Sequence, residues 1–322
     1  MRPKPLLRLL RSVQEQSLYP DEILVVDGST NSETRIVLVE NTFKNLTYFL
    51  VPKEYRGLTR QRNYGVDKAS ETSDMIAFVD DDTELTPNYF EELVRTFVAD
   101  KTIFGVGGVA LNENSWVLAE PNKQYNKYHF FQFDKFVYKE GKRNVVRNYL
   151  RLQSNLEPGK MPDYSHGRTC GFPLDGKIYK VDLLIGMSFA FRKIVFDSIQ
   201  FSSYFEGYGL YEDADFSIRA LQFGSNVINT KVQLNHYHDA SGRPNQYQYG
   251  KMVVRNGWYV WRTKNPTPTF THQFKWHSIT ILLTLIRFSN TFTTHKRKQA
   301  LTEALGRTVG WWSLIFNKPK DK

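Results

Sequence analysis

Apolar and polar positions in the first third of the chain switch between a helical and a strand period, which predicts alternating helices and strands. Apolar residues recur at helical spacing between residues 4 and 16, and the run Glu22–Val26 then indicates a buried strand. The same patterns predict helices at 32–41, 58–68 and 86–100 and strands at 47–51, 75–79 and 104–111. Strands that alternate with helices of this length indicate an α/β fold with a doubly wound, mostly parallel sheet flanked by helices.

The pattern changes after residue 111. Residues 112–177 are polar, basic and aromatic, and we expect an excursion that covers the open end of the sheet rather than a separate domain. Strand and helix patterns return between residues 178 and 234, and the remainder is helical, basic and rich in tryptophan. We therefore predict an α/β domain over residues 1–240 and a helical C-terminal extension over residues 241–322.

The composition of the chain favours a globular protein with an anionic partner. Hydrophobic residues make up 41% of the 322 residues and aromatic residues 15%, which suits a packed core. The net charge of +10 favours a nucleotide, an anionic lipid surface or a nucleic acid as the partner. Because the basic residues are spread along the chain and no nucleic-acid motif occurs, we expect no nucleic acid.

Cysteine use and the lack of long apolar runs bear on the location of the protein. Cys170 is the only cysteine, which excludes an internal disulfide and is compatible with a reducing cytoplasm. No apolar run approaches the roughly 18 residues of a spanning helix, and Arg8 and Arg11 interrupt the stretch that a signal peptide would need. We expect a cytoplasmic protein, soluble or peripheral at the inner face of the cell membrane.

Three consecutive aspartates, Asp80, Asp81 and Asp82, directly follow the predicted strand 75–79. Ligands of open α/β sheets gather at the carboxyl ends of strands, and three crowded carboxylates repel one another strongly without a cation. Oxygen ligands of this kind favour Mg²⁺ or Mn²⁺, bound together with substrate phosphates. The alternative is that the aspartates only end the strand and cap a turn.

Four segments follow one another in the order of a known family. They are Asp27–Thr30 after a strand, Gly57–Gly65 at the start of a helix, the aspartate triplet, and Glu212–Asp215. In this order the chain resembles a family 2 glycosyltransferase of the GT-A fold, of the bacterial rhamnosyl- or galactofuranosyl-type that builds polysaccharides. Each segment alone is a weak signal, whereas the combination is specific.

The resemblance implies a site for a nucleotide-sugar. Asp27 takes the position of the aspartate that contacts the nucleoside, with Ser29 beside it. The helix that carries Arg62 and Asn63 borders the nucleotide pocket, where a guanidinium would offset diphosphate charge. The alternative for Arg62 is a solvated helix face.

The aspartate triplet matches the metal-binding motif of the family. The resemblance implies Asp80 and Asp82 as ligands of Mn²⁺ or Mg²⁺, with Asp80 and Asp81 also facing the donor. His236 and His238 alternate along a strand end, so we expect them to point to opposite sides. A histidine of this stretch can complete the metal shell in related enzymes, and we choose His238. The alternative is an edge histidine without a ligand role.

Asp213 matches the general base of the family, which deprotonates the acceptor hydroxyl as it attacks the anomeric carbon. Glu212 beside it would orient a sugar hydroxyl or the base. The alternative for both residues is an acidic first helical turn, which the helix dipole favours. Asp215 and Arg219 stand four residues apart in the same helix, so we expect them to form a structural pair.

One strand of the family is missing from its expected place. The family begins with an apolar strand before its first helix, whereas this chain starts at Arg2-Pro3. That strand is central in the sheet, and without it the backbone groups of its neighbours would be unpaired. We expect the sequence to be truncated or its start codon to be placed too late.

The C-terminal extension interleaves basic residues with tryptophan, tyrosine and phenylalanine. This pattern is typical of helices that lie on an anionic bilayer, which would suit a lipid-linked acceptor. The alternative is ordinary helices that pack on the α/β domain with tryptophan and leucine in the core.

The leading interpretation is an inverting, metal-dependent glycosyltransferase, a hexosyl- or deoxyhexosyltransferase of cell-surface polysaccharide synthesis. It would move a sugar from a nucleotide-sugar donor to a saccharide acceptor, free or lipid-linked. Two alternatives stay open. One is a metal-dependent phosphoesterase built from the aspartates and histidines, and the other is a truncated, inactive glycosyltransferase-like binding protein.

Overall fold

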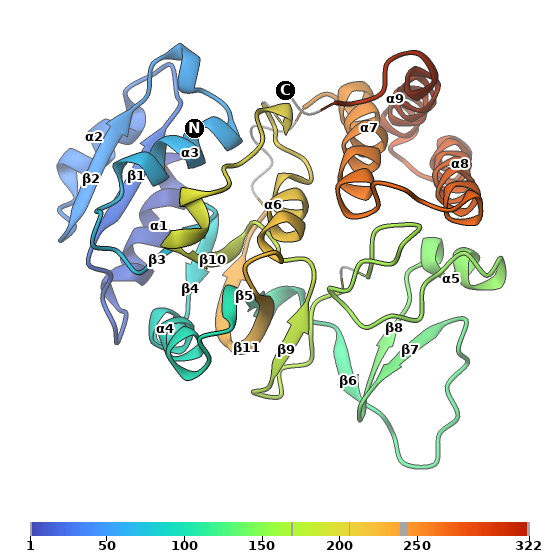
Figure 1. Cartoon of the computed structure of the whole chain (residues 1–322), viewed down its shortest axis with the longest axis horizontal. Helices are drawn as coiled ribbons and strands as arrows, with labels where there is room; N and C mark the ends of the chain where they lie inside the picture. The colour runs from blue at the N-terminus through green and yellow to red at the C-terminus, as the bar shows by residue number, and fades with distance from the viewer. Residues whose placement is uncertain (1, 169, 206, 239–243, 321–322) are drawn as a thin grey trace. The chain divides into compact units, whose positions relative to one another are not determined.

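The computed structural model describes residues 2–168, 170–205, 207–238 and 244–320. The chain forms two compact units of different architecture. Residues 1–114 and 174–243 make up the α/β unit, and residues 115–173 and 244–322 make up the helical unit. The predicted α/β class and the helical C-terminal extension are confirmed (Figure 1).

The elements of the α/β unit follow the apolar patterns of the sequence. Its strands are β1 (Ile23–Asp27), β2 (Leu46–Leu50), β3 (Met75–Val79), β4 (Thr83–Leu85), β5 (Ile103–Ala110), β9 (Ile178–Val181), β10 (Ser188–Arg192) and β11 (Ser225–His236). Its helices are α1 (Pro3–Gln14), α2 (Glu33–Glu40), α3 (Leu58–Lys68), α4 (Tyr89–Ala99) and α6 (Glu212–Ala220), with the 3-10 helices η1 (Lys53–Tyr55), η2 (Leu111–Glu113), η3 (Lys193–Asp197) and η4 (Ser203–Phe205). The strands β1, β3 and β5 lie within one residue of their predicted ranges.

The main sheet is mixed, so the prediction of a mostly parallel sheet is wrong in this respect. Its strand order is β3-β10-β5-β11-β4, and β9 also pairs with β11. The pair β5–β11 is parallel, whereas β10 runs antiparallel to both β3 and β5, and β11 runs antiparallel to β4 and β9. The cause is β10, which enters between β3 and β5 in the opposite direction. A hydrophobic pattern indicates that a strand is buried, but it does not indicate in which direction the strand runs.

The strands β1 and β2 form a separate parallel pair beside the main sheet (Figure 1). Within the described residues, β1 pairs with no strand other than β2, and β3 pairs with no strand other than β10. Helix α3 covers β1, where the side-chain amide of Gln61 donates to the carbonyl of Val26 at 2.8 Å. Side chains of α3 therefore supply part of the hydrogen bonding that a neighbouring strand would otherwise provide.

The two faces of the main sheet carry different cores, because side chains alternate along β10. Ala190 faces a cluster built with α1 and α4, which includes Leu9, Val13, Leu93 and Phe97. Phe189 and Phe191 face the opposite side, where they pack with phenylalanines of β3, η3, the following loop and α6, namely Phe78, Phe196, Phe201 and Phe216. This aromatic layer supports the candidate site described below.

The helical unit combines a small antiparallel sheet with four helices in the described residues. Its strands are β6 (Trp116–Leu118), β7 (Phe130–Phe133) and β8 (Phe136–Lys139), in the order β6-β8-β7. Its helices are α5 (Lys142–Tyr149), α7 (Gln246–Lys264), α8 (Phe270–Thr293) and α9 (Arg297–Phe316). Asn245 and Thr269 cap α7 and α8 with their side chains. Throughout the described ranges, no helix has both the length and the hydropathy of a bilayer-spanning segment.

Residues 115–173, most of the predicted excursion, belong to the same unit as the C-terminal helices. This division differs from the predicted division of the chain at residue 240. Hydrogen bonds explain this grouping. The indole of Trp261 in α7 donates to the carbonyl of Asp163 at 2.8 Å, and the Lys264 ammonium donates to the carbonyl of Met161. These contacts join segments about a hundred residues apart, which local sequence patterns do not report.

Candidate active site

The aspartate triplet lies in the tight turn that leads from β3 to β4. The backbone N–H of Asp80 donates to the carbonyl of Met187, and the carbonyl of Asp82 accepts from the N–H of Tyr237 after β11. The Thr83 hydroxyl donates to the carbonyl of Asp80 at 2.7 Å. The turn is thus fixed to two other segments, and its acidic side chains are held at the end of the sheet.

Asp80, Asp82 and His236 form a group that could hold a metal ion, because their ligand atoms all lie within 4.8 Å of one another. The Nε2 atom of His236 is 3.4 Å from Asp82 Oδ1. Two carboxylates and one imidazole suit Mn²⁺ or Mg²⁺, with further positions left for water and phosphate oxygens. The donor set therefore fits the divalent ion that the sequence predicted.

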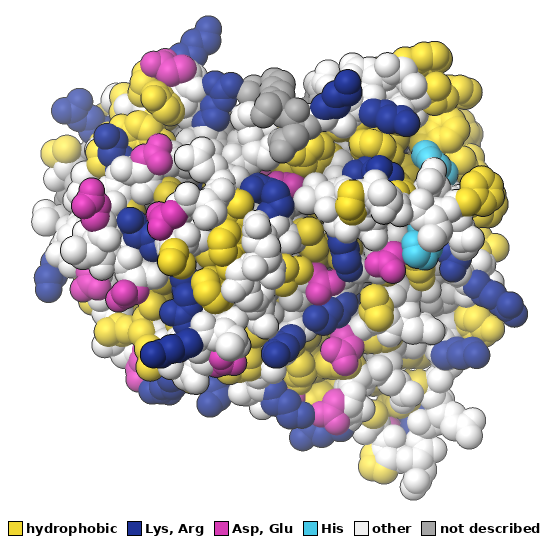
Figure 2. Space-filling model, in the orientation of Figure 1, with side chains coloured by type: hydrophobic (Ala, Val, Ile, Leu, Met, Phe, Trp, Pro, Cys, Tyr) yellow, Lys and Arg dark blue, Asp and Glu magenta, His cyan; other side chains and the backbone are white. Residues whose placement is uncertain are grey.

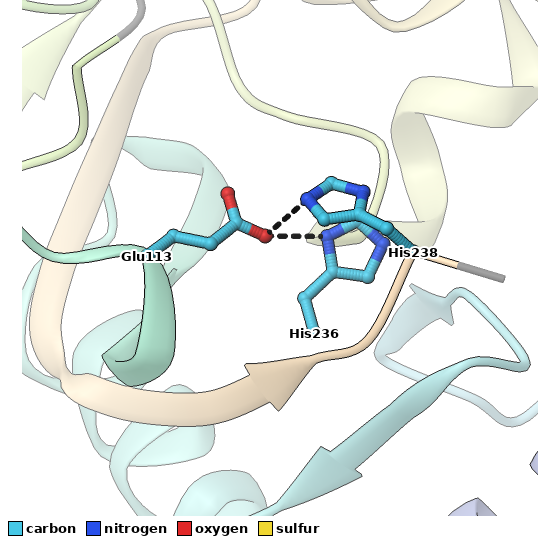
Figure 3. A group of neighbouring side chains, drawn as sticks. All are labelled: Glu113, His236 and His238. Atoms are coloured by element: carbon cyan, nitrogen blue, oxygen red, sulfur yellow. Dashed lines mark hydrogen bonds and ion pairs between the residues drawn. The ribbon is translucent and has the colours of Figure 1, made fainter.

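Both histidine rings contact Glu113 (Figure 3), and the ring of His236 also lies against Asp82. The prediction that the two histidines point to opposite sides is wrong, since their ring centroids are 4.0 Å apart. The strand ends at His236, and His238 has the left-handed φ of 51°, so the alternation of a strand no longer applies there. The residue grouped with Asp80 and Asp82 is thus His236 rather than His238. A metal-binding role for either histidine stays a prediction.

Arg2 is a basic residue of this site that the sequence analysis did not predict. Its guanidinium pairs with Asp82 at 2.8 Å and also with Asp81. Burial raises the pKa of Asp81 to about 6, with Arg2 opposing the rise and the charges of Asp82 and Asp80 adding to it. Burial also raises the pKa of Asp80. The crowded carboxylates therefore gain from any nearby cation.

Arg62 connects the aspartate triplet with the second acidic segment. Its guanidinium is buried, pairs with Glu212 of α6 and lies 3.7 Å from Asp80. It also packs over the aromatic layer, 4.8 Å from the ring centroid of Phe189. The alternative of a solvated helix face is therefore wrong, and Arg62 pairs with a residue that lies 150 positions away in the chain.

Glu212 and Asp213 lie in the first turn of α6, and both also make specific contacts that an interaction with the helix dipole alone would not require. Glu212 is buried beside Arg62, and burial raises its pKa against the effect of that charge. Its second oxygen, Oε2, is buried without a hydrogen-bond partner among the described residues. Asp213 is half-buried, and its Oδ2 accepts from the backbone N–H of Gly186 at 2.9 Å.

Gly186 lies where Arg62, Glu212 and Asp213 meet. A Cβ atom at this position would lie 3.2 Å from Glu212 Oε1 and 3.3 Å from both Arg62 Nη2 and Asp213 Cβ. The carbonyl of Gly186 also accepts from Arg62 at 3.2 Å. The absence of a side chain therefore allows the three charged groups to approach one another, which no local motif predicted.

The predicted pair of Asp215 and Arg219 is confirmed. Their side chains are joined by two hydrogen bonds of 2.9 and 2.7 Å, and Asp215 is fully buried. This carboxylate therefore has a structural role in α6, in contrast to Asp213 two positions before it.

Asp27 and Ser29 lie at the end of β1, where they bind each other. The Asp27 carboxylate is buried and accepts from the N–H and hydroxyl of Ser29 and from the hydroxyl of Tyr48. Burial and this contact raise the pKa of Tyr48 to about 12. Asn63 exchanges two hydrogen bonds of 2.9 Å with the backbone of Phe201. Contact of these residues with a nucleotide stays a prediction.

Comparison with known proteins finds a family model that matches the N-terminal part of the chain. The model of glycosyl transferase family 2 matches residues 1–157. A glucosyl-dolichyl phosphate glucuronosyltransferase of Haloferax volcanii is 30% identical over 115 residues, which cover 35% of this chain and 34% of that protein. EpsH of Bacillus subtilis, provisionally named a glycosyltransferase, is 25% identical over 239 residues, 71% of this chain and 55% of that protein.

The matches thus span about a third and about half of the length of these curated relatives. A solved structure of GalNAc-T7 with UDP, GalNAc and Mn²⁺ overlaps 78% of this chain and 45% of that one, with a TM-score of 0.49 and 16% identity. The family match includes β1, α3 and the aspartate triplet, which are three of the four segments on which the resemblance rested. Residues 1–157 of the chain are therefore similar to glycosyl transferase family 2.

Proposed function

We propose that the chain is an inverting, metal-dependent glycosyltransferase that moves a sugar from a nucleotide-sugar donor to a saccharide acceptor. The observation that carries this proposal is the buried Arg62, which pairs with Asp80 of the candidate metal group and with Glu212 beside Asp213. A donor diphosphate needs cations, and an acceptor hydroxyl needs a base. The two requirements meet within one connected group of side chains.

Asp80, Asp82 and His236 would hold the divalent ion, Mn²⁺ or Mg²⁺. A bound ion would neutralise the donor diphosphate and the charge that builds on the leaving nucleoside diphosphate. Arg62 lies beside Asp80, so its guanidinium would add positive charge at the same place. Asp27 and Ser29 are proposed to contact the nucleoside, with Asp81 and Asn63 at the border of the donor pocket.

Asp213 is the proposed general base. Its Oδ2 accepts from the backbone N–H of Gly186 and its Oδ1 from the N–H of Ala214, so the carboxylate is oriented while it stays half-exposed. In a single displacement, the acceptor oxygen forms a bond to the anomeric carbon and the bond to the diphosphate breaks. The hydroxyl proton passes to Asp213, and the anomeric configuration inverts. The free oxygen of Glu212 is proposed to orient the acceptor sugar.

The helical unit supports a membrane-linked acceptor as the finer proposal. Exposed apolar side chains recur along one row of α8 and one row of α9, namely Phe270, Phe274, Ile281, Leu285, Phe288 and Phe292, and then Leu305, Val309, Trp312 and Phe316. Figure 2 shows hydrophobic side chains gathered where these helices reach the surface. The exposed Lys296, Arg297 and Lys298 lie between the two rows in the chain. Apolar rows with flanking cations suit the inner face of an anionic membrane and a lipid-linked saccharide of surface polysaccharide synthesis.

The donor is tested by thermal unfolding with UDP, GDP and dTDP, each with and without Mn²⁺. A ligand that binds only the folded state raises the unfolding temperature. We expect a metal-dependent rise with one diphosphate that is lost in Asp82→Asn and kept in Asp67→Asn, a matched change on the exposed face of α3. No rise with any diphosphate would contradict a donor site and favour the inactive, binding-protein alternative.

The reaction is tested with a panel of sugar nucleotides that carry the nucleoside diphosphate selected in that experiment. Proton NMR of the product reports its anomeric configuration, and we expect inversion. Retention would overturn the role of Asp213. Release of phosphate from simple phosphate esters without any acceptor would instead support the phosphoesterase alternative.

Membrane binding is tested by flotation with vesicles of phosphatidylcholine alone or mixed with phosphatidylglycerol. We expect the protein to float with the anionic vesicles and the Leu285→Ser/Phe288→Ser double variant to stay in solution. Val98→Ser in the α/β unit is the control, since Val98 is also exposed. Equal flotation of the wild type and the double variant would contradict the membrane proposal.

A further inference from the structure

Glu113, His236 and His238 converge on one point at the end of β11 (Figure 3). Glu113 Oε1 is 2.9 Å from Nδ1 of His236 and 2.8 Å from Nε2 of His238. The three ligand atoms all lie within 4.8 Å of one another. Both imidazole nitrogens are thus turned toward one carboxylate oxygen, in direct contacts that a bound ion would replace.

The backbone around these three residues is held by contacts outside the group. The side-chain amide of Asn112, next to Glu113 in η2, exchanges two hydrogen bonds with the backbone of His236, of 2.7 and 2.9 Å. Tyr237, between the histidines, points away and donates to Glu84 at 2.5 Å under the guanidinium of Arg8. These contacts fix η2 to the strand end before any ligand arrives, and such preorganisation favours binding.

The backbone of His238 gives a second observation. Its φ of 51° is a left-handed conformation that a residue with a side chain rarely adopts, and strain of this kind gathers at ligand sites. The conformation turns the imidazole of His238 back toward Glu113. The side chains of His238 and Glu113 are 54% and 40% exposed, so an ion and water can reach the group from solvent.

We propose that Glu113, His236 and His238 form a second metal site, which takes a transition-metal ion of the Zn²⁺ class. Two imidazoles and one carboxylate are a ligand set that Zn²⁺ and Co²⁺ prefer, with an open position for water or a substrate group. The group Asp80, Asp82 and His236 is richer in oxygen and suits Mn²⁺ or Mg²⁺. The two sites therefore differ in the ion that they select.

His236 is shared between the two sites. Its Nδ1 faces Glu113 and its Nε2 faces Asp82. An ion at the second site changes the charge and the proton on the ring that faces the first, so each ion weakens the binding of the other by the same factor. This consequence, unlike the second site itself, rests on the metal site of the proposed function.

The site is tested by titration of the full chain, free of any histidine tag, with Zn²⁺ in a calorimeter and with Co²⁺ by visible absorption. We expect saturable binding with the absorption bands of a Co²⁺ ion bound by nitrogen and oxygen. Glu113→Gln and His238→Asn should each weaken binding by at least roughly tenfold to a hundredfold, because loss of even a supporting group around a metal costs that much. His295→Asn, a change of an exposed histidine of the helical unit, should leave it unchanged.

The variant Asp80→Asn separates the second site from the donor site. We expect it to lose Mn²⁺-dependent nucleotide binding and to keep Zn²⁺ binding, whereas His238→Asn should do the reverse. Two results would overturn the proposal, provided that circular dichroism shows folded variants. One is Zn²⁺ binding that is the same in Glu113→Gln, His238→Asn and the wild type. The other is Zn²⁺ binding lost in Asp80→Asn but kept in His238→Asn, which would assign the ion to the first site.

Discussion

The aspartate triplet is flanked on two sides by charged residues, and the two sides differ in how deeply these charges are buried. On the α3–α6 side, Arg62 and Glu212 are buried, so solvent screens them little, and Arg62 packs over a phenylalanine ring. On the β11 side, His236 is half-buried while Glu113 and His238 are exposed. Buried charges are costly to leave unpaired, whereas exposed ligands exchange easily with water and ions. The first side is therefore suited to fixed positions for chemistry, and the second to the entry and exit of ions.

The largest effect is expected on the α3–α6 side from Asp213→Asn. An amide cannot accept the acceptor proton, so kcat should fall by about 10²- to 10⁴-fold while the affinity for nucleotide and Mn²⁺ stays the same. Initial rates with the donor identified above give the kcat, and calorimetry gives the affinities. Asp67→Asn serves as the matched control. A variant with a tenth or more of the wild-type kcat would show that the base lies elsewhere.

The contrast between buried and exposed charges is tested by Arg62→Ala and Arg95→Ala. Arg62→Ala leaves two acidic groups without their buried cation and should lower the free energy of unfolding by about 3–5 kcal/mol. Arg95 pairs with Glu91 and Glu92 on the exposed face of α4, so its loss should cost at most about 1 kcal/mol. Urea unfolding at neutral pH measures both. Equal losses would show that burial around Arg62 does not set the energy of its pairs.

The aspartate triplet between the two sides should respond to pH through competition between protons and Mn²⁺. The pKa of Asp81 is raised to about 6, and that of Asp80 is also raised. Protons therefore occupy these carboxylates more readily when the chain is folded, and the ion-free protein should lose stability as pH rises through about 6. Mn²⁺ needs the charged carboxylates, so its dissociation constant should fall over the same range.

Calorimetric titration with Mn²⁺ between pH 5 and 7.5, together with thermal unfolding without metal, checks both signs. Asp81→Asn removes one of the crowded groups, so the change in Mn²⁺ affinity should move to lower pH. An affinity for Mn²⁺ that does not change over this range would show that the aspartates are not its ligands.

The smallest effect is expected from Gly186→Ala. A Cβ atom there would lie 3.2–3.3 Å from Glu212, Arg62 and Asp213, so these groups must shift by a few tenths of an ångström. We expect kcat to fall by roughly tenfold, because small misplacements of reacting groups lower rates, and the free energy of unfolding to fall by about 1 kcal/mol. Gly141→Ala, where no atom lies within 4 Å, is the control. An unchanged kcat would show that the three groups need not be placed so closely.

Local sequence patterns predicted the elements of the α/β unit better than their pairing. The apolar run before the aspartate triplet is β3 as expected, and Asp215 and Arg219 pair because helical geometry alone brings them together. The antiparallel direction of β10 was missed because a buried strand has the same pattern in both directions. The contact between Arg2 and Asp82 was missed because it joins residues 80 positions apart.

His236 and His238 show that prediction from local sequence patterns can fail even within one short motif. Alternation along a strand predicts opposite sides for His236 and His238, but the left-handed backbone of His238 reverses the second ring. Glycine would have indicated such a turn clearly, whereas histidine, although enriched in this conformation, is a weaker signal. The importance of Gly186 was also unpredictable. A side chain at this position would meet residues of both α3 and α6, and a local pattern does not show that these helices come together there.

The contact between α7 and α9 has a consequence for how the helical unit can vary. A Cβ atom on Gly250 would lie 2.2 Å from the carbonyl oxygen of Glu303, and one on Gly306 would lie 2.0 Å from that of Tyr247. Gly310, one turn further along α9, faces the backbone of Lys251 at 3.1 Å. A shift of α9 by one residue along α7 would bring a side chain against backbone at each of these points. The glycines thus fix the register of the helix pair, whereas the exposed apolar rows of α8 and α9 carry no such constraint.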